Sequence, residues 1–102
     1  VAQRISKGPI KIGAGKFTII GETSATFDPG SLADGAGETK ADIAVAGAAF
    51  GDYVLWAAPY SVQGLSVTAY VHAAGLVAIR VQNESGGAVD LASGAWHVKV
   101  IR

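Results

Sequence analysis

The stretch LSVTAYVHAAGLVAIRVQN, residues 65–83, decides the fold of this chain. Apolar and polar side chains alternate through its first half and again through its second half, which is the two-residue period of a strand with one buried face. Between the two runs, Ala73-Ala74-Gly75 suits a three-residue hairpin loop with glycine in the left-handed conformation. The stretch therefore predicts an antiparallel β-hairpin. Its expected core-facing residues are Leu65, Val67, Ala69 and Val71 in one strand and Val77, Ile79 and Val81 in the other.

The rest of the chain repeats this pattern in short apolar runs separated by glycine-rich turns, and the alanines do not recur at helical spacing. Further strands are expected at 16–22, 39–47, 53–59 and in the closing run AWHVKVIR, with turns at 28–30, 51–52 and 83–87. The alternation within 39–47 predicts one face with Ala41, Ile43 and Val45 and another with Lys40, Asp42 and Ala44. The closing run should direct Trp96, Val98 and Val100 inward.

About six to eight short antiparallel strands in a chain of 102 residues predict an all-β fold. The architecture is left open between an antiparallel β-sandwich, a jelly-roll-like fold and a partly open barrel. We expect a single domain, with a β-sandwich at residues 17–102 and an extended basic N-terminal arm at residues 1–16.

The composition limits the classes of function. The chain has no cysteine, which excludes disulfides, thiolate metal sites and cysteine nucleophiles. Half of the residues are hydrophobic and only 16% are charged, so intrinsic disorder is not expected. No apolar run approaches the roughly 18 residues of a membrane span, and no export signal is recognisable. We therefore expect a soluble protein whose partners include neither a membrane nor nucleic acid.

The net charge is zero, but the charges are unevenly distributed. Residues 1–16 contain four basic residues and no acid, which gives +4, and these are Arg4, Lys7, Lys11 and Lys16. Residues 17–42 contain five acids against one lysine, which gives −4. This pattern suits an arm that contacts an acidic surface, including the same segment of a neighbouring copy. The alternative is a solvated terminus with no partner.

Groups able to do chemistry are few. GAGKFT at 13–18 resembles a phosphate-binding loop, but Ile10 stands where the pattern needs glycine and Phe17 where it needs serine or threonine. His72 and His97 lie on different predicted strands, without the close pairing typical of metal ligands. No serine stands in a nucleophile motif. We therefore expect no catalytic residues, no metal and no cofactor, and a protein that is not an enzyme.

Aromatic residues offer a second kind of site. Trp56, Trp96, Tyr53, Tyr60 and Tyr70 would form a carbohydrate-binding platform if several were exposed together. Trp96 follows the inward alternation, whereas Tyr70 lies on the outward face and therefore indicates association. Asn83-Glu84-Ser85 matches a glycosylation acceptor, which we interpret as a chance match.

Residues 27–102 carry a series of motifs in a fixed order. They include DIAVAGAAFGDYVLWAAP, the VTAYV hairpin, the NESGG turn and the closing ASGAWHVKVIR. This part of the chain resembles a family of small virion structural proteins from tailed bacteriophages and prophages. Some members of that family are capsid decoration, or cement, proteins. Residues 1–26 lie outside the resemblance.

The resemblance implies a homotrimer on the capsid exterior of a virion, made in the host cytoplasm, that bridges subunits of the major capsid protein. On this interpretation Arg4, Lys7, Lys11 and Lys16 would contact the capsid. The interface candidates are Trp56, Tyr70 and His72. Two alternatives stay open: a tail-fibre or head-fibre module that binds a host receptor or carbohydrate, and an interaction module or small hydrolase whose site the sequence does not reveal.

Overall fold

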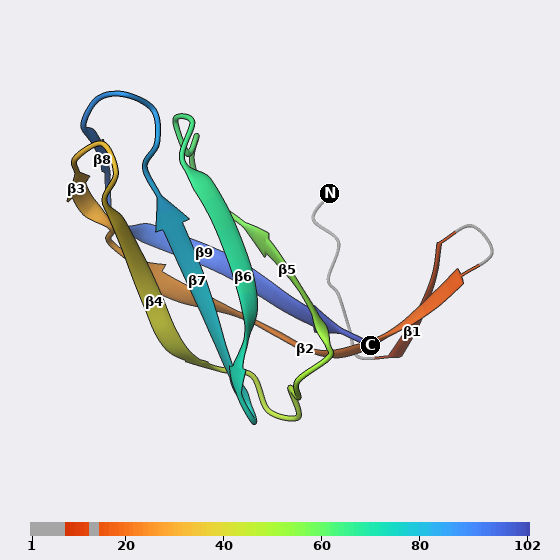
Figure 1. The fold of residues 1–102 in the computed structure, drawn as a ribbon. Helices are drawn as coiled ribbons and strands as arrows, with labels where there is room; N and C mark the ends of the chain where they lie inside the picture. The colour runs from red at the N-terminus through yellow and green to blue at the C-terminus, as the bar shows by residue number, and fades with distance from the viewer. Residues whose placement is uncertain (1–7, 13–14) are drawn as a thin grey trace.

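The computed structural model describes residues 8–12 and 15–102, with side chains from Phe17 onward. This part of the chain forms nine strands and contains no helix (Figure 1). The strands are β1 Gly8–Ile12, β2 Gly15–Phe27, β3 Gly30–Leu32, β4 Gly37–Ala44, β5 Tyr53–Ala57, β6 Ser66–Ala73, β7 Leu76–Gln82, β8 Val89–Leu91 and β9 Gly94–Ile101. Every strand pairing among them is antiparallel, which confirms the predicted all-β class.

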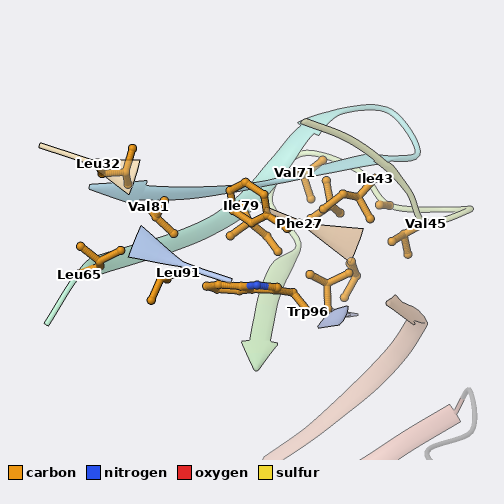
Figure 2. Packing of buried hydrophobic residues seen from close by; sticks show 14 residues of the cluster. Phe27, Leu32, Ile43, Val45, Leu65, Val71, Ile79, Val81, Leu91 and Trp96 are labelled. Atoms are coloured by element: carbon orange, nitrogen blue, oxygen red, sulfur yellow. The ribbon is translucent and has the colours of Figure 1, made fainter. Parts of the chain in front are cut away.

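The strands form two main sheets and a short ribbon. The four-stranded sheet has the order β1-β2-β9-β5, the three-stranded sheet has the order β4-β7-β6, and β3 pairs with β8. Side chains from both main sheets share one buried cluster, so the chain is a single domain around a single core. Figure 2 shows Ile79 of β7, Trp96 of β9 and Phe27 of β2 within this core. The predicted inward residues of the closing run, Trp96, Val98 and Val100, are buried as expected.

The hairpin predicted from residues 65–83 is confirmed as β6 and β7. Its loop is shorter than predicted, because Ala73 pairs with Leu76 and only Ala74 and Gly75 form the turn. Gly75 has a φ of 74°, the left-handed conformation expected of it. The register shifts between Val71 and Ala73, and this bulge takes up the residue that we had assigned to the loop.

Strand β4 departs from the alternation predicted for 39–47. Ile43 and Val45 are buried as expected, but the register shifts between Lys40 and Ile43. Lys40 pairs with Ile79 and Ile43 pairs with Val77, so these two β4 residues share one face of the sheet. The prediction that they face opposite ways is therefore wrong. The cause is a bulge at Asp42, whose φ of 60° is tolerated because aspartate visits the left-handed region more readily than most residues.

The N-terminal region contributes to the four-stranded sheet. Strand β1 pairs with the start of β2, and β2 then continues along β9 from Ile19. The boundary that we placed between residues 16 and 17 therefore falls inside β2. Figure 1 shows the β1–β2 hairpin extending beyond the other strands.

The NESGG turn is organised by a buried side chain. Asn83 has no exposed surface, and its Nδ2 donates to the carbonyl oxygens of Leu32 and Gly87, each at 2.8 Å. Its Oδ1 accepts from the Ser85 amide at 3.0 Å and from the Ser85 hydroxyl at 2.7 Å. Because the amide nitrogen is buried and donates both hydrogens, the folded chain offers no glycosylation acceptor at this position.

Candidate association surface

Exposed large apolar side chains are concentrated between residues 50 and 56. Phe50 is 76% exposed, Tyr53 63%, Leu55 51% and Trp56 38%. Among the described residues only one other large apolar side chain is comparably exposed, Tyr70 at 44%. We call Phe50, Tyr53, Leu55 and Trp56 the β5 surface. Exposure of this many large apolar groups in one short segment is unusual in a monomeric domain, which makes the β5 surface the candidate association surface.

The position of β5 in its sheet explains this exposure. In the part of the chain that the structure describes, β5 is hydrogen-bonded to β9 and no strand pairs with its other edge. Tyr53 and Leu55 pair with Ile101 and Lys99 of β9, which places both on the outer face of the sheet. Both side chains are more than half exposed there.

Trp56 lies on the opposite face of β5. It pairs with the buried residue Val98, so its indole points toward the core side of the sheet. The indole rings of Trp56 and Trp96 have centroids 6.0 Å apart at an angle of 33°. Trp56 therefore packs against the core with one part of its ring and stays exposed with the other, because β5 is the last strand on its side of the sheet.

The loop before β5 is held in place by the last residue of the chain. Arg102 Nε donates to Asp52 Oδ1 at 2.8 Å, and its Nη2 donates to Asp52 Oδ2 at 2.9 Å and to the Gly47 carbonyl at 3.2 Å. Asp52 Oδ2 also accepts from the Ala49 amide at 3.0 Å. The hydrogen bonds from Arg102, more than that from Ala49, lower the pKa of Asp52. The predicted turn at residues 51–52 is confirmed and presents Phe50 to solvent.

The aromatic residues are divided between the core and the surface. Trp96 is fully buried between Phe27 and Tyr60, with ring centroids 5.5 Å and 5.9 Å away. Its Nε1 donates to the Tyr60 hydroxyl at 3.2 Å, and that hydroxyl donates to the Ala92 carbonyl. The prediction that Trp96 belongs to the core is confirmed. Trp96 and Tyr60 are thus held by one another and take no part in an exposed platform.

Two of the predicted interface residues lie on the other sheet. Tyr70 pairs with Ala78 of β7, which places it on the outer face of the three-stranded sheet, as predicted. His72 lies on the same strand, and its Nε2 is 3.2 Å from Asp42 Oδ1 of β4. Of the three candidates, only Trp56 belongs to the β5 surface, so the structure does not gather them into one site.

The basic residues predicted to contact the capsid lie at the N-terminal end. Arg4 and Lys7 lie outside the described residues. Lys11 and Lys16 occupy directly opposed positions in the pairing of β1 with β2. Their backbone therefore belongs to the hairpin that extends beyond the other strands (Figure 1).

The remaining candidates for chemistry are placed as follows. The lysine of GAGKFT lies in β2, which continues as a strand instead of leading into a helix. No group of three or more histidine, aspartate and glutamate side chains converges in residues 17–102 in a way that could hold a metal ion. The described strands and loops include no helix of the length and hydrophobicity needed to cross a membrane.

Sequence reasoning did not single out Phe50 or Leu55. The signal was present in YVLWA at residues 53–57, where every position is apolar and the alternation of a half-exposed strand is missing. Such a run is typical of a strand covered on both faces, whereas Pro59, which cannot donate to a ladder, predicts that the strand ends there or lies at an edge. The strand order places β5 at the edge of its sheet. Comparison of this chain with protein families, with curated proteins and with solved structures found no match.

Proposed function

We propose that this protein decorates a bacteriophage capsid, binding the outer surface of the head as a homotrimer and stabilising it by bridging subunits of the major capsid protein. The observation that carries this proposal is the β5 surface, an uncovered apolar segment on a small all-β domain. A domain whose prominent exposed side chains are apolar, and not nucleophilic or metal-binding, is suited to binding another protein. The resemblance of residues 27–102 to phage virion proteins supports the same function.

The proposed architecture is a β-sandwich with an N-terminal arm. Its two layers would be the four-stranded and three-stranded sheets, whose side chains share one core. The arm would comprise residues 1–16 and would approach acidic patches on the capsid through its four basic residues. Each such contact is modest, but several contacts tethered to one trimer act at a high effective concentration and raise the overall affinity.

Co-sedimentation with capsids that lack the protein tests this proposal. Saturable binding at one trimer per local threefold site, followed by a rise in the temperature at which heads open, is the expected result. A variant with all four arm residues changed to serine should bind less tightly, with the largest difference at low salt, because counterions screen its charges at high salt. The absence of binding to heads would contradict the proposal.

The fibre-module alternative has one structural observation in its favour. Tyr53 and Trp56 are both exposed on β5, and aromatic side chains can stack against sugar rings. Binding of the protein to host-cell glycans, together with loss of that binding in Trp56→Ala, would favour this function over capsid decoration.

A further inference from the structure

We infer that the β5 surface is where copies of this chain contact one another. The occupant of the surface is therefore the β5 region of a second copy. This inference deepens the proposed function, because it assigns to a particular strand the self-association that a trimer requires. It does not depend on the capsid and is tested without one.

The size of the surface fits an interface. With about 150–250 Å² for a whole aromatic side chain, the measured exposures correspond to roughly 400 Å² of apolar area on one copy. Stable interfaces bury about 800 Å² on each partner, with an apolar centre and a polar rim. The β5 surface is therefore about half of one partner's contact area, which matches the apolar centre of an interface without its polar rim.

The edge of β5 lacks the features that keep edge strands apart. Such edges are commonly protected by lysine, proline, a bulge or an inward charge, because their unpaired backbone groups attract other strands. YVLWA at 53–57 contains none of these residues, and its pairing with β9 runs without a register shift. β6 lies close to β5 but does not pair with it, so this edge remains available to a strand of another chain. A second copy of the chain is the one partner that is always present in equal amount.

Charge also favours a second copy. Groups close to a symmetry axis approach their own copies, so the centre of an interface between identical chains is stable only where like charges are absent or neutralised. Asp52 pairs with Arg102 in a two-bond contact, and Lys99, which stands opposite Leu55 on β9, has Glu22 of β2 opposite it on its other side. Charges of opposite sign therefore lie together beside the β5 surface, so identical copies can approach there without a net repulsion.

The first experiment measures the mass of the purified protein in solution by light scattering and sedimentation, over a range of concentrations. The test variant is Leu55→Lys, and Thr68→Lys is its matched control, since Thr68 is exposed on the outer face of the other sheet. We expect the wild type and the control to assemble and Leu55→Lys to be monomeric. Far-UV circular dichroism and thermal unfolding establish that each variant is folded.

Cysteine cross-linking gives a second, independent measurement. The chain has no cysteine of its own, so Leu55→Cys and Thr68→Cys each introduce a single thiol. Under mild oxidation Leu55→Cys should form linked pairs of chains in high yield, and Thr68→Cys should not. This variant keeps the surface apolar and so tests proximity without disturbing assembly.

The outcomes separate this inference from the proposed function. A trimer or dimer that Leu55→Lys dissociates supports the inference, and a dimer would at the same time contradict the proposed homotrimer. A wild type that is monomeric at every concentration overturns the inference, even if the monomer binds capsids. Assembly that persists in Leu55→Lys, with no cross-linking through residue 55, also overturns it, because the copies then meet elsewhere.

Discussion

His72 and Asp42 meet on the outer face of the three-stranded sheet although their strands are not neighbours. The Nε2 atom of His72 on β6 lies 3.2 Å from Oδ1 of Asp42 on β4, and β7 runs between the two strands. Both residues sit at bulges, where the register shifts against β7. The β7 residue on the same face nearby is Ala78, which is fully buried. Two bulges and one small side chain thus allow a contact that regular strands would keep apart.

The backbone at Asp42 is expected to matter more than its side-chain contact with His72. Both side chains of the pair are well exposed, and exposed pairs contribute at most about 1 kcal/mol. A β-branched residue at the φ of 60° found here should cost about 1–2 kcal/mol. Asp42→Asn should therefore change the free energy of unfolding little, whereas Asp42→Val should lower it clearly. Urea denaturation measures both, and equal losses in the two variants would contradict this ranking.

Asn83 is expected to be the most sensitive polar residue. Replacing it by alanine leaves the carbonyls of Leu32 and Gly87 and the amide of Ser85 without their buried partner. Each unsatisfied group costs about 1–3 kcal/mol, partly relieved by water, so we expect Asn83→Ala to lower the free energy of unfolding by about 2–4 kcal/mol. Ser85→Ala removes only one partner of Asn83 and serves as the matched control, with a loss of about 1 kcal/mol. A loss no larger than that of the control would show that the turn does not depend on this side chain.

Gly94 is expected to resist even a methyl group. A Cβ atom there would lie 2.7 Å from Pro59 Cγ and 3.1 Å from Tyr60 Cε2. Pro59 is a rigid ring and Tyr60 is tied to Trp96, so neither can move away freely. Gly94→Ala should destabilise the protein by about 1–3 kcal/mol through overpacking. Gly87→Ala, where a Cβ would meet open space, is the control and should be close to neutral.

Asp52 is expected to contribute to the acid sensitivity of the fold. Its pKa is lowered below the ordinary value of 3.8 in the folded state, chiefly by hydrogen bonds from Arg102. A carboxyl with a lowered folded pKa adds stability that is fully present above its unfolded pKa and is lost as the pH falls through its folded pKa. The wild type should therefore lose stability below about pH 4 more steeply than Asp52→Asn. Urea midpoints at neutral and acidic pH measure this difference, and parallel profiles for the two proteins would contradict it.

The sequence by itself determined the class of the fold and most of its core. The alternation in residues 65–71, 77–81 and 96–100 is local, and it identified most of the buried residues of β7 and β9 together with Val71 of β6. Val67 and Ala69 of β6 are only half-buried, and Ala78 and Ile101 are buried although the alternation did not predict it. Period-two alternation leaves a strand no other way to bury its apolar side chains, so these segments need no knowledge of their partners. The turn at Asn83 and the left-handed glycine at residue 75 were also predicted from the sequence, because asparagine, serine and glycine favour turns through their own local chemistry.

Only the tertiary structure decided which strand lies at the edge and where the bulges occur. The run at 53–57 is apolar throughout and would suit a central strand, so its exposure follows from the order β1-β2-β9-β5. The bulges at Asp42 and His72 contain no glycine and do not interrupt the hydrophobic pattern, so the sequence does not indicate them. Strand order and bulge position depend on contacts between segments that are distant in the sequence. A two-residue hydrophobic pattern is local and does not predict those contacts.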